Sequence, residues 1–494
     1  MNYVSTRDVS ANPIGVTSAE AIKKGLAPDK GLYMPTAIPS LSLSDIEEIA
    51  ALPYEKRAAR ILSMFLCDYD KDKLLSDCTE AYSEERFPGG AAPLVHIGDG
   101  VYSLELWHGP TCAFKDMALQ IMPRLLSSAL KMTGEEKRAH ILVATSGDTG
   151  KAALEGYRDV DGIDITVYFP VDGVSTMQKM QMTTQAGENV NVMAVYGNFD
   201  DAQNGVKAIF ADSDLAKKAE ECGFFFSSAN SINWGRLAPQ IVYYVSAYCD
   251  LVKSGAVKLG EKMNVCVPTG NFGNIFAAYI AKTMGLPIDK MICASNANCV
   301  LTDFINTGLY DRQRVFHKTM SPSMDILISS NLERLLFLLG GAETTKDCME
   351  KLTRDGKYQA PDSLMEKIRE TFYGYSASEE ETAATIKATY EKKNYLADPH
   401  TCVALGCLEK YRRDTGDSTP CVVASTASPY KFSQDVCASL GSPCTSDEPA
   451  VILDTLEKLS GTTAPAPLKA TLTMPVRFKS VCDPKDMADC IFNG

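Results

Sequence analysis

The sequence predicts an α/β protein with two open, largely parallel sheets that follow a mostly helical N-terminal region. From about residue 96 onward, short apolar runs of strand length alternate with amphipathic runs of helical length. This order is typical of parallel sheets covered by helices. The chain has 494 residues, which is too long for one compact core, and its 45% hydrophobic and 22% charged residues are ordinary for a folded protein.

The first part of the chain, up to about residue 95, is predicted to be mostly helical. Apolar residues recur at helical spacing over 42–52 and 55–65. The segment 86–93, with the sequence RFPGGAAP, concentrates residues that interrupt regular structure. We therefore expect the N-terminal region to end there.

The rest of the chain is predicted to alternate strands and helices. The predicted strands are 140–144, 163–169, 190–195, 264–267, 291–294 and 421–424. The helices between them include 151–157, 177–185, 201–211 and 274–284. In open parallel sheets, ligands bind at the carboxyl ends of the strands. The candidate ligand-binding segments are the loops 145–149, 268–274 and 425–431 and a helix start at 114–116.

Charge and composition exclude several classes of partner and location. The net charge of −13 disfavours nucleic acid and anionic membrane surfaces, because both require a basic protein face. Residues 1–10 lack the pattern of a secretory signal, and no run of about 18 apolar residues occurs, so we expect a cytosolic location. The 16 cysteines show neither CxxC pairs nor zinc-ligand spacing, so no metal site is expected and most should be small buried hydrophobes.

The loop 268–274, with the sequence PTGNFGN, follows a predicted strand and opens a predicted helix. Glycines allow backbone N–H groups to approach an anion closely, and a helix N-terminus adds a favourable dipole. These features suit a bound phosphate. An ordinary glycine-rich turn would have the same composition, so the residues alone leave both interpretations open. The GxGxxG pattern of dinucleotide-binding loops is absent.

The loop 145–149, with the sequence TSGDT, has the same context and offers hydroxyl and N–H donors for a carboxylate or a phosphate. Lys151 follows Gly150, but the spacing differs from GxxxxGK[ST] and Ala152 stands at the hydroxyl position. A nucleoside triphosphate site is therefore not expected. Simple capping of the helix by Ser146 or Asp148 is the alternative interpretation.

Lys115 stands between Phe114 and Asp116 at the start of an apolar helical run over 117–130. A lysine in apolar surroundings loses solvation, so its amine is more easily deprotonated and becomes nucleophilic. An aldehyde cofactor requires such an amine. Taken alone, a solvated surface lysine at a helix start is the commoner explanation.

Together these segments resemble threonine synthase of the longer bacterial and fungal type. The resemblance extends over nearly the whole chain, and its motifs occur in order. They are YVSTR at 3–7, GLYMP at 31–35, FKD at 114–116, TSGDTG at 145–150, NSINWGR at 230–236, PTGNFGN at 268–274, SPSMDI at 321–326 and DPHT at 398–401.

The resemblance implies the fold-type II architecture of pyridoxal-phosphate (PLP) enzymes, in which two α/β domains hold the cofactor, pyridoxal 5'-phosphate, between them. The implied domains are an N-terminal region at 1–95, a large PLP-binding domain at 96–135 and 210–494, and a small domain at 136–209. The implied activity is that of a carbon–oxygen lyase acting on phosphate in threonine biosynthesis, which converts O-phospho-L-homoserine and water to L-threonine and phosphate.

The resemblance also implies roles for individual residues. Lys115 would form the internal aldimine and then shuttle protons at Cα and Cβ of the substrate, while phosphate leaves from Cγ and water adds at Cβ. Thr426 would be the hydroxyl partner of the pyridine nitrogen, which a neutral partner leaves largely unprotonated. The residues implied to bind the cofactor phosphate are Gly270, Asn271, Phe272, Gly273 and Asn274. The residues implied to bind substrate are Thr145, Ser146, Gly147, Asp148 and Thr149 for its carboxylate, and Asn233 and Arg236 for its phosphate.

Some departures and alternatives stay open. Ser428 stands where many members have histidine, and Lys151 stands where a smaller residue is more common. One alternative is another fold-type II enzyme, such as threonine dehydratase or cysteine synthase, although those usually carry other phosphate loops. A second is a threonine synthase-like phospholyase that gives 2-oxobutyrate, and a third is a non-catalytic metabolite-binding paralogue, which the intact Lys115, Thr426 and 270–274 argue against. We expect a small-molecule substrate and a monomer or homodimer.

Overall fold

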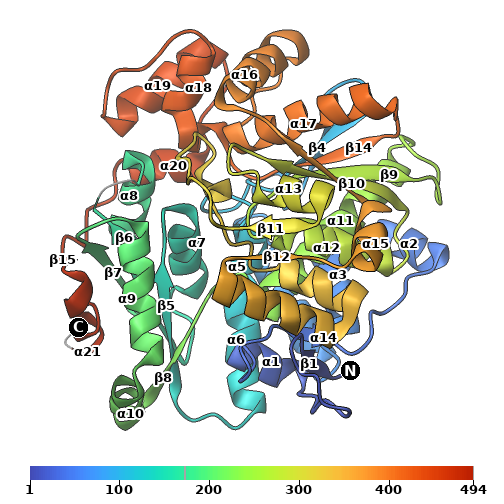
Figure 1. Ribbon diagram of the computed structural model, residues 1–494. Helices are drawn as coiled ribbons and strands as arrows, with labels where there is room; N and C mark the ends of the chain where they lie inside the picture. Colours follow the sequence, from blue (N-terminus) through green and yellow to red (C-terminus); the bar gives the residue numbers. More distant parts are fainter. Residues whose placement is uncertain (172–173, 493–494) are drawn as a thin grey trace.

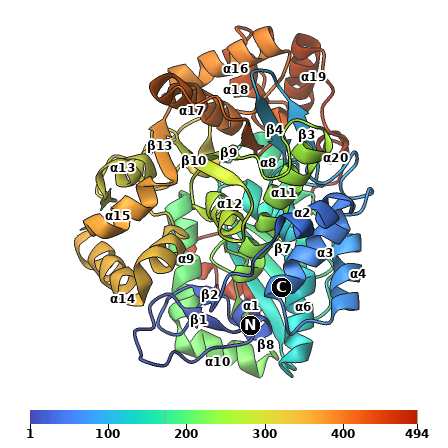
Figure 2. The same ribbon diagram turned by 90° about the vertical axis from the view of Figure 1, so that its right-hand side faces the viewer.

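The computed structural model describes residues 1–171 and 174–492, which form two large sheets and two small two-stranded ones, with helices packed around them (Figures 1 and 2). One sheet has six strands in the order β13-β10-β9-β14-β4-β3, and the other has five in the order β15-β7-β6-β5-β8. Every neighbouring pair in these two sheets is parallel except β3 and β4. The predicted α/β class with two open, largely parallel sheets is confirmed.

The six-stranded sheet is built from segments far apart in the sequence. Its strands are β3 (Leu94–His96), β4 (Val101–Glu105), β9 (Met263–Pro268), β10 (Ile288–Ser295), β13 (Phe372–Ser376) and β14 (Cys421–Ser425). Three of them include the strands predicted at 264–267, 291–294 and 421–424. Every residue of β9 and β14 is buried, as central strands with both faces covered require.

Helices cover both faces of this sheet (Figure 1). They include α11 (Trp234–Lys253), α12 (Gly273–Thr283), α13 (Val300–Thr307), α16 (Glu379–Lys393) and α17 (Pro399–Thr415). Alternate residues of β9 point to opposite faces: Val265 and Val267 belong to the core formed with α11 and α12, whereas Cys266 packs in the core formed with α17. The loop after each strand therefore emerges between two helical layers.

The five-stranded sheet consists of β5 (Arg138–Ala144), β6 (Ile163–Pro170), β7 (Val190–Val195), β8 (Phe224–Ser227) and β15 (Val481–Cys482). Its neighbouring helices include α7 (Asp148–Tyr157), α8 (Thr176–Thr183), α9 (Phe199–Ala211) and α10 (Ser213–Glu221). The range 136–209, predicted as the small domain, contains only the strands β5, β6 and β7. The strands β8 and β15 lie in the range predicted for the large domain, yet they pair with β5 and β7. Neither has the length and alternation that mark a strand in sequence.

The N-terminal region is mostly helical, as expected. It contains α1 (Ser18–Lys24), α2 (Leu43–Ala50), α3 (Tyr54–Phe65) and α4 (Lys71–Ala81), with a small antiparallel pair of β1 (Tyr3–Ser5) and β2 (Tyr33–Pro35). Thr17 and Ser42 begin α1 and α2 with reciprocal side-chain and backbone hydrogen bonds, in which Glu20 and Asp45 complete the capping boxes. The helices predicted over 42–52 and 55–65 are α2 and α3.

The apolar run after Lys115 forms two helices, α5 (Asp116–Leu119) and α6 (Met122–Met132), rather than one. The other helices and strands are α14 (Leu332–Asp355), α15 (Asp362–Arg369), α18 (Ser433–Ser439), α19 (Pro449–Ser460), α20 (Ala466–Thr471), α21 (Asp489–Phe492), β11 (Leu309–Asp311), β12 (Lys357–Gln359) and the 3₁₀ turns η1 (Pro322–Met324), η2 (Pro429–Phe432) and η3 (Pro484–Asp486). Within the described ranges, no helix has the length and apolar character needed to cross a membrane. All sixteen cysteines are free thiols and most are buried, as predicted.

Candidate active site

Lys115 contacts Asp148 after β5 directly, and its neighbours Phe114 and Ser323 connect it to the loops that follow β14 and β9. Lys115 Nζ lies 3.9 Å from Oδ2 of Asp148 in the loop after β5. The backbone N–H of Phe114, next to Lys115, donates to the carbonyl of Thr426 after β14 at 2.8 Å. The hydroxyl of Ser323 accepts from Lys115 Nζ at 3.2 Å, and the carbonyl of the same residue packs against Gly270 after β9. The structure therefore brings together the three loops that the sequence singled out.

Lys115 is a buried lysine at the start of α5, with its side chain 11% exposed. Its ammonium also lies 5.1 Å from the centroid of the Phe114 ring. Burial lowers the pKa of Lys115 to about 8, because the charged form loses its hydration, although the nearby Asp148 carboxylate opposes the shift. The neutral fraction of such an amine near physiological pH is far larger than that of an ordinary lysine, and the neutral form is able to attack a carbonyl carbon.

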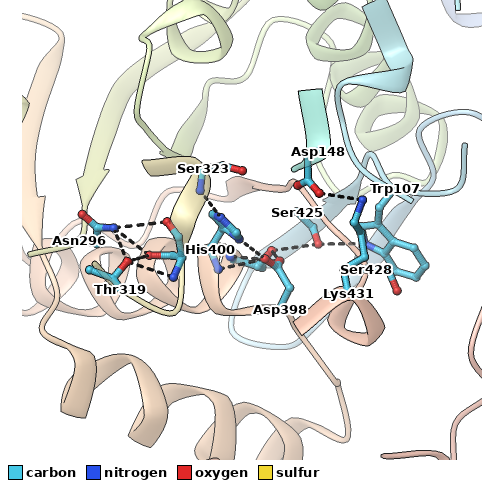
Figure 3. Close-up of polar contacts among 12 residues, drawn as sticks. Trp107, Asp148, Asn296, Thr319, Ser323, Asp398, His400, Ser425, Ser428 and Lys431 are labelled. Atoms are coloured by element: carbon cyan, nitrogen blue, oxygen red, sulfur yellow. Dashed lines mark hydrogen bonds and ion pairs between the residues drawn. The ribbon is translucent and has the colours of Figure 1, made fainter. Parts of the chain in front are cut away.

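Asp148 is bound by a second buried lysine, Lys431 (Figure 3), which lies closer to it than Lys115 does. Lys431 Nζ lies 2.8 Å from Oδ1 of Asp148 and donates to the carbonyl of Thr111 at 2.8 Å. The amide of Gln178 donates to the same Oδ1 at 2.8 Å. Burial opposes ionisation, but the cations of Lys431 and Lys115 hold the pKa of the Asp148 carboxyl well below its usual range. Asp148 is therefore an anion whose main counterion is Lys431.

Asp116 fixes the turn that leads into Lys115. Its carboxylate accepts from the backbone N–H and the hydroxyl of Thr111 at 2.8 and 2.7 Å. Burial raises the pKa of Asp116 to about 6, and the Thr111 hydrogen bonds limit the shift. A side chain at Gly109 would collide with Asp116, since a Cβ there would lie 2.5 Å from Oδ2. This tight turn positions Lys115 at the end of β14.

The loop after β9 has the form of a phosphate cradle. Phe272 adopts a left-handed backbone conformation with φ +62° and ψ −3°, which costs a non-glycine residue about 1 kcal/mol. This turn starts α12 at Gly273, so that unpaired backbone N–H groups face the start of the helix. A Cβ at Gly270 would lie 2.7 Å from the Ser323 carbonyl, so only glycine fits there.

Asn274 gives this loop an unused donor. Its Oδ1 accepts from the Tyr244 hydroxyl, whereas its Nδ2 is buried without a hydrogen-bond partner in the described residues. Leaving a buried donor unsatisfied costs about 1–3 kcal/mol. An anion at the N-terminus of α12 would satisfy the donor.

Thr426 follows β14 and is buried. Its carbonyl accepts a hydrogen bond from the backbone N–H of Phe114, and the adjacent Ala427 forms an isolated antiparallel β-bridge with Ala113. The hydroxyl of Thr426 makes no hydrogen bond to any residue in the ranges 1–171 and 174–492. A neutral hydroxyl is thus available on the segment that pairs with the chain just before Lys115.

The loop 145–149 is shaped by Thr145, whose hydroxyl accepts from the backbone N–H groups of Gly147 and Gly150 at 3.0 Å each. Gly147 has φ +146°, and a Cβ there would lie 2.4 Å from Gln178. The hydroxyls of Ser146 and Thr149 make no hydrogen bond within the described part of the chain, and Ser146 is exposed. These two hydroxyls are therefore available to a ligand, and their role toward a carboxylate stays a prediction.

Asn233 and Arg236, predicted near a substrate phosphate, differ in what they still offer. Asn233 caps α11: its Oδ1 accepts from the N–H of Gly235 and its Nδ2 donates to the carbonyl of Ile22, each at 2.8 Å. Arg236 donates to the carbonyl of Ala229, but its Nε is buried without a partner among the described residues. Burial lowers the pKa of Arg236 to about 10. Arg236 retains a donor for an anion, and the Asn233 amide already serves the helix cap.

Several residues of the site had no role assigned from sequence. They are Gln178, Ser323, Asp398, His400 and Lys431. Three of them lie in motifs that carry the resemblance, SPSMDI and DPHT, and one lies in the predicted loop 425–431, but nothing in the sequence says which side chains meet.

The two residues that depart from the family pattern, Ser428 and Lys151, make local contacts. The backbone N–H of Ser428 donates to the carbonyl of Cys112 at 3.1 Å, and Lys151 lies 3.2 Å from Glu155 and donates to Gln185.

Comparisons with known proteins agree with this geometry. Residues 2–82 match the family model described as "Threonine synthase N terminus", and residues 89–426 match "Pyridoxal-phosphate dependent enzyme". The chain is 39% identical to threonine synthase of Pseudomonas aeruginosa, over 88% of this chain and 90% of that protein, and 37% identical to the Saccharomyces cerevisiae enzyme, over 93% of each. It is 41% identical to human threonine synthase-like 1, but spans only 58% of that protein's length.

Solved structures show the same fold. The crystal structure of PLP-bound threonine synthase from Brucella melitensis superposes with a TM-score of 0.88 at 35% identity, over 100% of this chain and 99% of that one. The yeast threonine synthase structure also gives a TM-score of 0.88, at 33% identity, over 100% of this chain and 97% of that one. The fold-type II architecture follows from these superpositions.

Proposed function

The chain belongs to the threonine synthase family of pyridoxal-phosphate-dependent enzymes, and from this premise we propose that it converts O-phospho-L-homoserine and water to L-threonine and phosphate. The observation that carries the proposal is the position of Lys115, a buried amine that lies 3.9 Å from Asp148 and donates to Ser323, beside the loops that follow three parallel strands. Such strand ends are where open α/β sheets bind ligands.

The residues at the site fit pyridoxal phosphate. Lys115 supplies an amine of lowered pKa, and Thr426 supplies a neutral hydroxyl for the pyridine nitrogen. The N-terminus of α12, the cramped Gly270 and the unsatisfied Nδ2 of Asn274 suit the dianionic phosphate. When bound, the cofactor would be linked to Lys115 as a Schiff base and would supply an electron sink for carbanions beside the substrate nitrogen.

The protein's own groups account for the rest of the reaction. The Lys115 amine, when it is not linked to the cofactor, would take a proton from Cα of the substrate and exchange protons at Cβ. Ser146 and Thr149 bind the substrate carboxylate, and Arg236 offers its unpaired Nε to the phosphate that leaves from Cγ. Because the Lys431 cation neutralises the Asp148 carboxylate, Asp148 does not require a protonated Lys115 as its counterion.

A second candidate is the phospholyase reaction, which would release phosphate and 2-oxobutyrate. The residues of the site suit this candidate as well, because both reactions take a proton from Cα and release phosphate from Cγ. The two reactions differ in whether water is added at Cβ, and a single assay separates them. The holoenzyme is supplied with O-phospho-L-homoserine, and phosphate, threonine and 2-oxobutyrate are measured together. We expect threonine and phosphate in equal amounts; 2-oxobutyrate in place of threonine would favour the phospholyase, and no phosphate release would contradict both.

The other expectations concern partners and location. We propose that the enzyme acts in the cytosol on a small-molecule substrate, without nucleic acid, as a monomer or a homodimer. The net charge of −13 supports the part on nucleic acid, because phosphate backbones repel an acidic surface. Light scattering after size-exclusion chromatography tests the oligomeric state, since the monomer mass is 53.6 kDa.

A further inference from the structure

A chain of hydrogen bonds leads from Lys115 through the 3₁₀ turn η1 to the start of α17, and Figure 3 shows its part from Ser323 to Asp398. Lys115 Nζ donates to the hydroxyl of Ser323 at 3.2 Å. The backbone N–H of Ser323 donates to Nε2 of His400 at 3.1 Å, and Nδ1 of His400 lies 2.7 Å from Oδ2 of Asp398. The function proposed above does not use His400 or Asp398.

These contacts fix the protonation of His400. The backbone N–H of Ser323 can only donate, so Nε2 of His400 must be the unprotonated nitrogen that accepts. Nδ1 then carries the proton and donates it to Asp398. His400 is therefore a neutral imidazole in a single tautomer, and its ring is held edge-on against Phe432 with 5.0 Å between the centroids.

Asp398 is itself immobilised. As the N-cap of α17, its carboxylate accepts from the backbone N–H groups of His400 and Thr401 at 3.0 and 3.2 Å, and from the Thr401 hydroxyl. The Thr401 hydroxyl is also 3.1 Å from the hydroxyl of Ser425 at the end of β14. Because Asp398 and Thr401 are fully buried and His400 nearly so, this network holds η1 in one place relative to the sheet.

The opposite end of η1 is anchored as well. The carboxylate of Asp325 accepts from the amides of Asn296 and Asn298 at 2.8 and 3.0 Å and from the Thr319 hydroxyl at 2.7 Å. Between the two anchors, the Ser323 carbonyl packs against the backbone of Gly270. The turn thus touches the amine of Lys115 on one side and the phosphate loop on the other.

We propose that the Ser323 hydroxyl orients the amine of Lys115 for proton transfer, and that His400, held by Asp398, is a positioning residue that acts through Ser323. This inference rests on the proposed function of Lys115. A neutral amine has two N–H donors and one lone pair. With Ser323 accepting one N–H and the Asp148 carboxylate lying 3.9 Å away on another side, fewer orientations of the lone pair remain.

The test compares single and double variants of the holoenzyme. Ser323→Ala removes only the hydroxyl, His400→Leu removes the acceptor that holds the turn, and His400→Gln keeps an acceptor oxygen near the position of Nε2. We expect each of the first two variants to lower kcat about 10-fold or more with KM changed less than about 3-fold, and His400→Gln to recover most of the loss. Thr345→Val is the matched control, because its buried hydroxyl bonds only to Gly341 within α14.

The double variant Ser323→Ala/His400→Leu decides whether the two residues act in series. If His400 acts through Ser323, kcat of the double variant is no lower than that of the worse single variant; losses of kcat that multiply would overturn the proposal.

A second readout uses the cofactor-free protein, in which Lys115 is labelled with trinitrobenzenesulfonate and the labelled peptide is quantified by mass spectrometry.

We expect the Lys115 labelling rate to change at least about 3-fold, by a common factor in both single variants and in the double variant, and to be unchanged in Thr345→Val. This readout needs no substrate, so it tests Ser323 even if O-phospho-L-homoserine proves not to be turned over. If His400→Leu does not fold, Ser323→Ala decides alone. An unaltered labelling rate of Lys115 in that variant would overturn the proposal.

Discussion

Lys431 and Lys115 share one carboxylate: Lys431 Nζ lies 2.8 Å from Oδ1 of Asp148, and Lys115 Nζ lies 3.9 Å from Oδ2. All three side chains are buried, and the closer contact belongs to Lys431. One negative charge cannot fully compensate two buried cations. Lys115, the more distant cation, is the one that gains by losing its proton, which is the form that cofactor chemistry requires.

Replacing Lys431 with glutamine tests whether Lys431, and not Lys115, is the main counterion of Asp148. The Lys431 cation lowers the pKa of Lys115, and its loss also removes the closer lysine partner of Asp148 and leaves Lys115 at 3.9 Å. The pKa of Lys115 is therefore expected to rise, and its labelling by trinitrobenzenesulfonate in the cofactor-free protein at pH 8 to slow several-fold. Lys151→Gln is the matched control, because Lys151 is also a buried lysine but pairs with Glu155. Equal slowing in both variants would contradict the role of Lys431 as the main counterion of Asp148.

The burial of Lys115 should cost stability in the cofactor-free protein. Burial lowers the pKa of Lys115 to about 8, whereas an unfolded lysine titrates near about 10.4. Between those values the unfolded chain binds more protons, so this contribution to stability rises with pH and is most unfavourable below pH 8. Lys115→Met is expected to raise the free energy of unfolding at pH 7 by about 1–3 kcal/mol.

The gain from Lys115→Met should shrink as the pH approaches 10, where the wild-type amine is neutral in the folded protein. Urea unfolding of the cofactor-free protein at pH 7 and pH 10 measures the difference. A gain of equal size at both pH values would show that the ionisation of Lys115 is not its origin.

Two glycines of the phosphate loop are expected to respond differently to alanine. At Gly270 the new Cβ would lie 2.7 Å from the Ser323 carbonyl, so Gly270→Ala should displace η1 and lower the Tm of the cofactor-free protein. At Gly273 the nearest atom, Nδ2 of Asn331, is 3.4 Å away, so the cofactor-free protein should tolerate alanine.

A loss of PLP affinity in Gly273→Ala without a change in that Tm would then report contact between this position and the cofactor itself. Titration of the cofactor-free protein with PLP, followed by absorbance, measures the affinity. Unchanged PLP affinity in Gly273→Ala would place the phosphate elsewhere.

Asn274 is expected to bind the cofactor phosphate through its unsatisfied Nδ2. A hydrogen bond to a charged group is worth about 1.5–3 kcal/mol, so Asn274→Ala should weaken PLP binding by about 10- to 150-fold. Pyridoxal, which lacks the phosphate, provides the control ligand. Its affinity should be nearly the same in the wild type and in Asn274→Ala; an equal loss for both ligands would mean that Asn274 does not contact the phosphate.

The sequence predicted the parts of the fold that rest on local pattern. The strands β5, β6, β7, β9, β10 and β14 have long apolar runs, and the loops after three of them could be placed at the site because parallel strands end at one edge. The two-residue strand β15 has no pattern to detect, and β8 is a run of three phenylalanines and a serine that carries no alternation. The small sheet therefore extends beyond its predicted range.

Within the site, the residues that could be named from sequence lie next to glycine-rich or hydroxyl-rich turns. Ser323 and His400 could not be placed, because Ser323 meets Lys115 from 208 positions away and His400 meets Ser323 from 77 positions away. Both contacts depend on how η1 packs against α17. Asn233, a polar residue in a motif, caps α11, and its role toward the substrate phosphate stays a prediction. Capping is a local role that a lone sequence does not separate from ligand binding.

Reduction of the holoenzyme with borohydride, followed by peptide mapping, tests directly whether Lys115 carries PLP. The treatment fixes PLP permanently to the amine that carries it, and mass spectrometry identifies the lysine. We expect the modified residue to be Lys115. The variant Lys115→Ala should acquire no modification and lose the absorbance band of the bound cofactor. Modification of Lys431 or Lys151, the other two buried lysines near Asp148 and Glu155, would contradict this expectation.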